Sequence, residues 1–335
     1  MTIQKAQCRT HLKPLVKALL FSGLALTAGL PAMAEQPLDC RDVVIVSPYA
    51  PGGTTDILAR LIAPDMQKEL GVPVIVTNKP GASSNIGTEF VSRAKPDGCT
   101  LLMGNNTGVV INRNLYELRH DPLQSLAPIA EVAAIPLVLY VNPSKMKVAT
   151  TAELIDELKK NPRKYSFASA GSGSPQHLAG ELVKQRSSVE MLHVPYKGSG
   201  PAVSDVIAGH VPISFDTTAV LLPHIKAGAV RPLATTSPKR TKVLPNIPTM
   251  TESGFSNFVI ENWYGMFAPA ETPKPLIERL NKAVNTALRS PRLTETLDKL
   301  GSADVAGTAQ EFSNFIAKEA PIWTEVVQKS GVKID

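Results

Sequence analysis

Residues 43–56 read VVIVSPYAPGGTTD, and this stretch decides the fold. An apolar run, Val43–Val46, leads into the turn Tyr49-Ala50-Pro51-Gly52-Gly53, and a segment with helical spacing opens at Thr55-Asp56. A strand, a glycine turn and a helix start in this order point several backbone N–H groups at one place. Because the first turn of a helix leaves these groups unpaired and carries partial positive charge, the stretch predicts an anion site in an α/β fold.

A second loop of the same kind reads Ser169-Ala170-Gly171-Ser172-Gly173-Ser174 and follows a strand predicted at 165–168. Ser174 is a good N-cap residue and Pro175 a good first residue for the helix behind it. Ligands of open α/β sheets bind beyond the carboxyl ends of strands, where both loops lie. Two such loops predict a ligand held between two halves of the protein.

Hydrophobic periodicity extends the α/β pattern along the chain. Strands are predicted at 43–47, 73–77, 100–104, 137–141, 165–168, 191–194, 211–215, 231–235 and 261–267. Helices are predicted at about 55–70, 85–94, 151–160, 175–185, 200–208, 219–227, 273–289 and 310–329. Two α/β lobes follow, 35–136 with 259–335, and 137–258, joined by hinge segments near 135–141 and 255–262.

The first 34 residues have the three parts of a secretory signal peptide. A basic segment without acids precedes the apolar run Ala18–Leu30, and Ala32-Met33-Ala34 is a small-x-small cleavage site. A membrane-spanning helix needs roughly 20 apolar residues, which this run lacks, so cleavage after Ala34 is favoured over an anchor. The chain is therefore expected to be exported.

The charge argues against a nucleic-acid partner. The formal net charge is +6, but four of the basic residues lie in the segment that is expected to be removed. The remainder has no basic field, and none of its apolar runs is long enough to span a bilayer.

Two cysteines follow the signal segment, Cys40 and Cys99, each just before an apolar run. If those runs are parallel neighbouring strands, both cysteines lie at the same strand ends, within bridging distance. In an oxidising compartment this predicts a Cys40–Cys99 disulfide, with two buried thiols as the alternative.

The ordered motifs resemble the tripartite tricarboxylate transporter substrate-binding proteins, the Bug family. The resemblance rests on YAPGGTTDILARLIAPDMQKELGVPVIVTNKPGASSNIGTEFVSRAKPDGCTLLMGN from Tyr49, FASAGSGSPQHLAGEL from Phe167 and HVPYKGSGPAVSDVIAGHVPISFDT from His193. It covers essentially the whole chain after residue 34. It implies a two-lobed periplasmic binding protein (type II, venus-flytrap), in which each lobe is a mostly parallel sheet flanked by helices.

The resemblance also implies a function and a site. The protein would capture a mono-, di- or tricarboxylate or an acidic amino acid in the periplasm and deliver it to a permease of the tripartite type. We expect a monomer without cofactor, metal site or catalytic residue. The ligand contacts carried over from matching motifs are Tyr49, Pro51, Gly52, Gly53, Thr54, Thr55, Asn106, Thr107, Ser169, Ala170, Gly171, Ser172, Gly173, Ser174, Asp216 and Thr217.

The chain departs from the family pattern at two places. Many members have an aromatic residue followed by Pro-Pro where this chain has Tyr49-Ala50-Pro51. Many have Gly-Ala-Gly-Gly where this chain has Gly81-Ala82-Ser83-Ser84. The first departure alters the expected pocket wall, so the identity of the ligand is not transferred from any relative.

Several alternatives stay open at this point. Asp216 is either a pocket acid that accepts a ligand ammonium or hydroxyl group, or a cap for the next helix. Trp263 and Tyr264 belong either to the core or to the pocket wall. A receptor that feeds a sensor protein would have the same binding chemistry, whereas a secreted enzyme would need an activated nucleophile, for which the sequence has no supporting motif.

Overall fold

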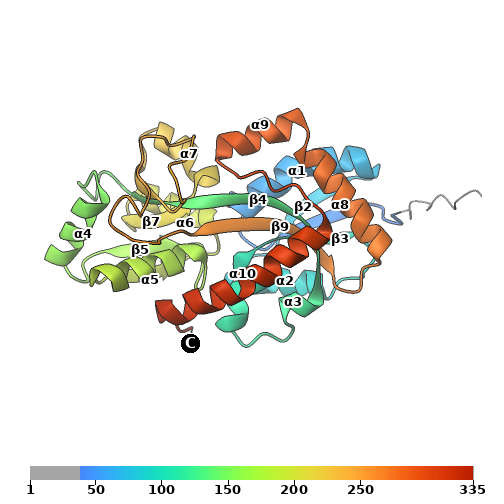
Figure 1. Ribbon diagram of the computed structural model, residues 1–335, viewed down its shortest axis with the longest axis horizontal. Helices are drawn as coiled ribbons and strands as arrows, with labels where there is room; N and C mark the ends of the chain where they lie inside the picture. Colours follow the sequence, from blue (N-terminus) through green and yellow to red (C-terminus); the bar gives the residue numbers. More distant parts are fainter. Residues whose placement is uncertain (1–37, 335) are drawn as a thin grey trace, which may run out of the picture. The chain divides into compact units, whose positions relative to one another are not determined.

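The structure is a computed structural model, and it describes residues 38–334. The predicted signal peptide and its cleavage site lie outside the described residues. Within them, nine strands form one sheet in the order β2-β1-β3-β9-β4-β7-β5-β6, and β8 pairs with β4 (Figure 1). The strands are β1 Val43–Ser47, β2 Val74–Asn78, β3 Thr100–Asn105, β4 Leu126–Val141, β5 Ser166–Ser169, β6 Leu192–Pro195, β7 Ile213–Thr217, β8 Arg231–Thr235 and β9 Glu261–Pro269.

The first part of the chain forms the predicted βαβαβ unit. Strand β1 pairs in parallel with β2 and β3, and helices α1, Thr54–Leu70, and α2, Asn85–Ser92, connect these strands. Gly71 ends α1 in the left-handed conformation, with φ 75°, which glycine adopts without steric cost. The sequence prediction for this unit is confirmed, with boundaries that differ by one or two residues.

Strand β4 is longer than predicted and joins the two parts of the sheet. The prediction began at residue 137, because Pro128, Glu131 and Pro136 interrupt the apolar run, but the strand begins at Leu126. The prolines are tolerated because the pairing with β9 is irregular, with register shifts after Pro128 and Glu131. Residues 126–136 pair with β9, whereas 137–141 pair with β7 and β8.

Two lobes follow from this topology. We call the part with β1, β2, β3 and β9 the first lobe, and the part with β5, β6, β7 and β8 the second lobe. The long strands β4 and β9 run side by side between them (Figure 1). The fold is the expected two-lobed α/β fold, and the assignment of each residue range to a lobe stays a prediction.

The second lobe repeats the alternation of strands and helices. Its helices are α4 Thr151–Lys160, α5 Pro175–Ser187, α6 Ser199–Ala208 and α7 Thr218–Lys226. Thr150 caps α4 by accepting the N–H of Glu153, and Ser174 caps α5 by accepting the N–H of His177. The cap at Ser174 is the one that the sequence predicts for α5.

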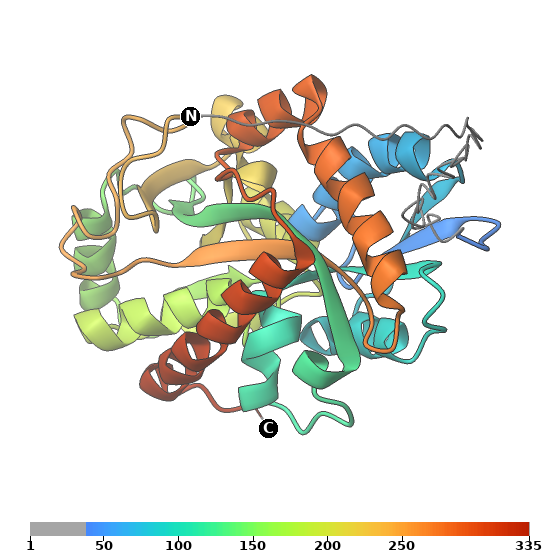
Figure 2. The same cartoon turned by 45° about the vertical axis from the view of Figure 1, so that its right-hand side comes forward.

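The C-terminal segment returns to the first lobe. Helix α8, Lys274–Leu288, packs against α1, and α10, Ala309–Ser330, packs against β4 and also against α5 of the second lobe (Figure 2). Between them lies α9, Pro291–Leu300, which the sequence analysis missed. Leu293, Leu297 and Leu300 share one face of α9, and Ser290 caps it ahead of Pro291, so its sequence carries the ordinary signals of a short helix.

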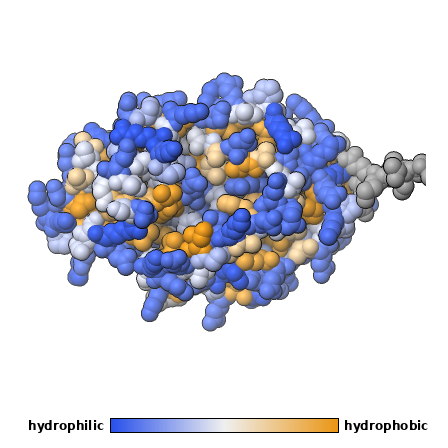
Figure 3. All heavy atoms as spheres, viewed as in Figure 1, coloured by the Kyte–Doolittle hydropathy of each residue, from blue (hydrophilic) through white to orange (hydrophobic). Residues whose placement is uncertain are grey.

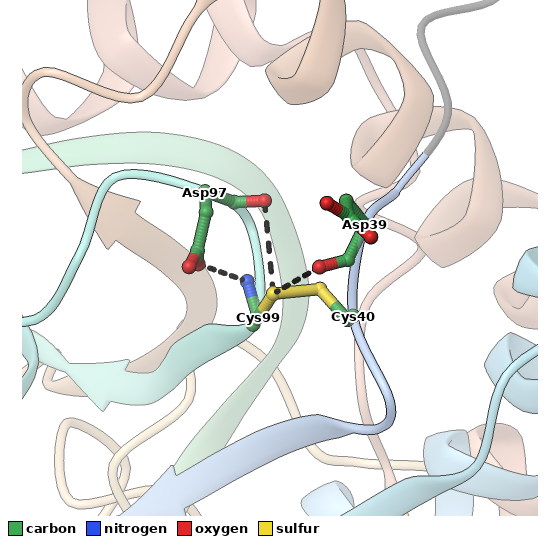
Figure 4. Close-up of a disulfide and its surroundings, with 4 residues drawn as sticks. All are labelled: Asp39, Cys40, Asp97 and Cys99. Atoms are coloured by element: carbon green, nitrogen blue, oxygen red, sulfur yellow. Dashed lines mark hydrogen bonds between the residues drawn. A yellow bond between two sulfur atoms is a disulfide. The ribbon is translucent and has the colours of Figure 1, made fainter.

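The predicted disulfide is present in the structure. Cys40 and Cys99 are bonded, with their Cα atoms 5.7 Å apart (Figure 4). The reason is the expected one, since β1 and β3 are parallel neighbours and each cysteine lies just before its strand.

Apolar side chains concentrate inside the described part of the chain. The face in Figure 3 is mostly hydrophilic, with apolar side chains in separate patches. Trp263 packs edge-on against Phe312 and Phe315 of α10, which assigns this tryptophan to the core. No helix among residues 38–334 is long and apolar enough to cross a membrane.

Candidate functional site

The first glycine loop is held in place from one side and open on the other. Gly53 is the N-cap of α1, and within the described residues no side chain caps it. Behind the loop, Asp56 accepts hydrogen bonds from the N–H of Gly52 at 3.1 Å and from Arg60 and Asn78 at 3.0 and 2.9 Å. Burial opposes ionisation of Asp56, but these donors hold its pKa below the ordinary value. Asp56 therefore positions the loop as an ionised carboxylate.

A small cavity lies beside this helix start. It is bordered by the C-terminal ends of β1 and β3, by the first residues of β9, and by the starts of α5 and α6. Its volume is about 10 Å³, enough for about one water molecule, so the two lobes are in contact. None of the residues that line it is charged. They are Tyr49, Gly53, Thr54, Thr55, Asn105, Ala170, Gln176, Ser199, Asn262 and Tyr264.

The second lobe closes on the first loop through residues 197–200. The N–H of Ala50 donates to the carbonyl of Lys197 at 2.9 Å, and the hydroxyls of Thr54 and Thr217 lie 2.8 Å apart. Gly200 packs so closely that an added Cβ would collide with the carbonyl oxygen of Pro51. Because neighbouring loops of opposite lobes form these contacts, opening the lobes must break them.

The second glycine loop has a different environment. Of its residues, only Ala170 lines the cavity. The carbonyl of Ser172 accepts hydrogen bonds from Ser83 at 2.7 Å and from Tyr116 at 3.2 Å, both in the first lobe. The N–H of Gly173 donates to Nδ1 of His177 at 3.0 Å. The structure thus places Ser172, Gly173 and Ser174 in contacts with their own helix and with the opposite lobe.

The stacked rings of His177 and His193 contact the second glycine loop. The rings of His177 and His193 lie 3.6 Å apart, and Nε2 of His193 is 2.6 Å from the hydroxyl of Ser169. Burial lowers the pKa of His177 to about 4 and that of His193 to about 3, although Glu181 lies 3.8 Å from His177. The Ser169–His193 contact does not form a catalytic pair, since Ser169 is fully buried and His193 is a weak base.

Asp216 lies one layer behind the cavity, at the end of β7. Its Oδ1 accepts hydrogen bonds from Ser199 at 2.9 Å and from the N–H of Thr217 at 2.8 Å. Burial raises its pKa to about 6, and the neighbouring donors only partly offset that rise. The N-cap of α7 is Thr217, so Asp216 does not occupy the capping position of this helix.

Other predicted residues lie close by without lining the cavity. Asn106 donates to the carbonyl of Glu261 at 3.2 Å, and Thr107 accepts from Asn105 at 3.3 Å. Pro51 and Gly52 contact the loop around Gly200. These residues shape the cleft from behind or from its rim.

Five lining residues were absent from the predicted site: Asn105, Gln176, Ser199, Asn262 and Tyr264. Strand alternation identifies the last two, because residues 262 and 264 share the face opposite Trp263. Tyr264 belongs to the pocket wall, and its hydroxyl accepts a hydrogen bond from Asn262 at 2.7 Å. Gln176 and Ser199 directly follow the helix-start signals Ser174-Pro175 and Gly198, where a side chain can reach a neighbouring strand end.

The site is chemically neutral. Burial raises the pKa of Tyr49 and of Tyr264, so both phenols remain protonated donors. Among the described residues no group of three or more metal-ligating side chains comes together. Hydroxyls, amides and a helix N-terminus without side-chain cap can bind an anion by hydrogen bonds alone.

Comparisons with known proteins agree with this fold. A family model described as the tripartite tricarboxylate transporter family receptor matches residues 58–332. Protein BugT of Bordetella pertussis is 35% identical over 311 residues, which cover 92% of this chain and 95% of BugT. The structure of R. palustris Rpa4515 with adipate has a TM-score of 0.85 at 33% identity, covering 88% of this chain and 99% of that one. MatC from Rhodopseudomonas palustris with bound malate has a TM-score of 0.81 at 29% identity, covering 86% and 99%.

Proposed function

The chain belongs to the tripartite tricarboxylate transporter receptor family, and we propose that it captures a small organic carboxylate and delivers it to a permease of that transporter. The family is a receptor family, and one similar solved structure is that of the periplasmic binding protein BugD, so the chain is a receptor and not an enzyme. We further propose that the mature protein begins at Glu35, after cleavage of the signal peptide, and works as a monomer in the periplasm.

One observation carries the proposal: the start of α1, with Gly53 as its N-cap, borders the cavity between the lobes. The N–H groups at this helix start and the neighbouring hydroxyls of Tyr49, Thr54 and Thr55 are suited to a carboxylate. Adipate and malate, the ligands of two relatives, are carboxylates of this kind.

Binding would be coupled to the movement of the lobes. A cavity that holds about one water molecule is too small for a carboxylate ligand, so the lobes must separate before a ligand enters. A ligand that contacts both lobes then stabilises a closed arrangement, and a permease recognises that arrangement. Because no charged side chain lines the cavity, binding is expected to be reversible, with a dissociation constant in the micromolar range, about −8 kcal/mol.

A thermal-shift screen of the mature protein, freed of co-purified ligand, tests the proposal. The panel contains mono-, di- and tricarboxylates and acidic amino acids, each beside its neutral amide as a matched control. A true ligand at a hundredfold excess over its dissociation constant adds about 2.7 kcal/mol of stability. We expect at least one acid, and none of the amides, to raise the melting temperature. A panel without any stabilising acid contradicts the proposed function.

The partner is tested separately, in cells. Deletion of the gene should abolish uptake of the acid that the screen identifies, and expression of the chain should restore it. Uptake that is unchanged by the deletion would contradict delivery to a permease and leave the binding function standing.

A further inference from the structure

The two sides of the cavity differ in hydrogen-bonding character. On the first-lobe side, the start of α1 presents backbone N–H groups and the phenol of Tyr49 stays protonated. On the second-lobe side lie Gln176 and Ser199, with Asp216 directly behind them. These three side chains are 2%, 6% and 0% exposed, so water does not satisfy them freely.

Ser199 uses its only proton away from the cavity. Its hydroxyl donates to Oδ1 of Asp216 at 2.9 Å, and an ionised carboxylate can only accept. The oxygen of Ser199 therefore faces the cavity with its lone pairs. The second oxygen of Asp216 has no hydrogen-bond partner within 3.5 Å among the described residues, although the Gln176 amide lies near enough to lower the pKa of this carboxyl group.

Gln176 adds a further acceptor, and its orientation follows from Ser199. Its Nε2 lies 3.5 Å from the Ser199 hydroxyl oxygen, and its Oε1 has no donor among the described residues. Turning the amide around would bring Oε1 against an oxygen whose proton is already committed to Asp216. The amide therefore keeps its nitrogen toward Ser199 and its carbonyl oxygen unpaired.

We propose that this receptor selects carboxylates that also carry a hydroxyl or ammonium group, which the acceptors of Gln176, Ser199 and Asp216 receive while the carboxylate faces the start of α1. The inference rests on the proposed function and adds the class of substrate. A buried acceptor without a donor is costly, so a ligand that brings the missing donor gains affinity that an unsubstituted acid does not. The unpaired carboxylate also disfavours a second ligand carboxylate on this side.

Matched ligand pairs test the proposal by calorimetry on the ligand-free, full mature protein. The first series is succinate, malate and aspartate, which differ only in one substituent. The second is glutarate, 2-hydroxyglutarate and glutamate, and the third is adipate and 3-hydroxyadipate. In at least one series we expect the donor-bearing acid to bind ten or more times more tightly than its parent. Parents that bind as tightly as their hydroxy and amino derivatives overturn the selectivity while leaving the carboxylate receptor intact.

Variants then assign the selectivity to the acceptors. Asp216→Asn keeps an Oδ1 that accepts from Ser199 and Thr217 but replaces the unpaired oxygen by an NH2 donor, and it should reduce the preference at least fivefold. Gln176→Met, which removes an acceptor and leaves the Asp216 carboxyl group itself in place, should reduce it in the same direction. Asp156→Asn makes the same chemical change on an exposed residue of α4, in the second lobe, and should leave the preference unchanged. An unchanged preference in folded Gln176→Met and Asp216→Asn overturns the assignment, and absence of binding by all of these acids contradicts the receptor function as well.

Discussion

The two glycine loops are similar in sequence and differ in what they contact. Each follows a strand of a parallel pair and opens a helix, the first from β1 into α1 and the second from β5 into α5. The first contributes Gly53, Thr54 and Thr55 to the cavity wall, whereas the second contributes Ala170 alone. Glycine spacing therefore places a loop at a strand end without determining whether its donors face a ligand.

The N-cap residue accounts for the difference. Ser174 accepts an N–H of the first turn of α5, and Gly173 donates to the ring of His177, so this helix end is satisfied by its own side chains. The N-cap of α1 is Gly53, which has no side chain to offer. A helix whose first turn is capped by its own side chain has fewer N–H donors left for a ligand. The sequence distinguishes the two cases, because Gly53-Thr54 starts the uncapped helix α1 and Ser174-Pro175 starts the capped helix α5.

The largest expected effect is a difference in acid sensitivity between the two loops. The second loop rests on His177 and His193, which are neutral when folded, with pKa values of about 4 and 3 against 6.5 in the unfolded chain. The unfolded chain therefore binds protons first as the pH falls, and each histidine removes up to about 1.4 kcal/mol of stability per pH unit below pH 6.5. This loss ends near pH 4 for His177 and near pH 3 for His193.

Unfolding by urea at pH 7 and pH 5 measures this effect. In the double variant His177→Asn with His193→Gln, the free energy of unfolding should depend less on pH. Asp216 and the other carboxyl groups are present in both proteins, so subtracting the variant's pH dependence from that of the wild type leaves the contribution of the two histidines. Hydrogen exchange should increase around Ser172 at pH 5, and stay low around Gly52, because Asp56 remains ionised there. Equal acid sensitivity of the two loops would contradict the comparison.

A steric change at the first loop should have the next largest effect. In Gly200→Ala the new Cβ would collide with the carbonyl of Pro51, which is backbone and cannot move aside. Overpacking of this kind costs about 1–3 kcal/mol, so we expect affinity for the identified acid to fall by about thirtyfold. In Gly173→Ala the Cβ meets the end of the flexible Leu115 side chain, but Gly173 has φ 82°, so alanine there costs about 1–2 kcal/mol of folding stability without blocking the contact between the lobes. If the variant at Gly173 weakens binding more than the variant at Gly200, the first loop is not the main ligand contact.

Removal of one hydroxyl from each loop gives a milder test. Thr54→Val keeps the shape of the side chain but loses the 2.8 Å contact with Thr217 and one donor to the cavity. A hydrogen bond of this kind contributes about 1–1.5 kcal/mol, which predicts roughly tenfold weaker binding by calorimetry. Ser172→Ala serves as the control, because only the carbonyl of Ser172 takes part in the described contacts. Equal losses in both variants would mean that the loops share the ligand evenly.

Most of the fold could be predicted because its signals are local. Apolar runs, Gly71 as a helix end, and the caps at Thr150, Ser174 and Thr308 fix helices and strands without reference to the rest of the chain. The start of β4 was missed because its prolines are tolerated only beside β9, a strand that lies more than 120 residues later. Helix α9 was missed although its signals are equally local, with Ser290 as its cap and Leu293, Leu297 and Leu300 on one face.

The candidate site was predicted in part, for the same reason. Thr54 and Thr55 follow from a local helix start. The chain reaches the cavity again at the start of α6, with Ser199, and in β9, with Asn262 and Tyr264. No local sequence pattern predicts that these segments lie beside the first loop. The position of Asp216 behind Ser199 depends on the packing of α6 against β7, so sequence alone left its role open.

The smallest expected effect concerns the contact of the second loop with the first lobe. Ala82, Ser83 and Ser84 all have positive φ, at 43°, 51° and 80°, a conformation that costs about 1–2 kcal/mol per residue outside glycine. The hydroxyl of Ser83 donates to the carbonyl of Ser172, a bond that a glycine at this position could not make. Ser83→Ala should therefore shift the lobes toward separation and weaken ligand binding about fivefold, since one neutral hydrogen bond contributes about 1 kcal/mol.

Nitroxides on Lys68→Cys and Lys160→Cys report the separation of the lobes by electron-electron resonance, without any ligand. Tyr116→Phe, which removes the second donor to the same carbonyl, should shift the distance distribution in the same direction. Ser204→Ala removes a serine–carbonyl bond within the second lobe and should not shift it. If Ser83→Ala and Tyr116→Phe leave the distribution unchanged, the second loop does not hold the lobes together, and its contrast with the first loop reduces to the difference between a capped and an uncapped helix.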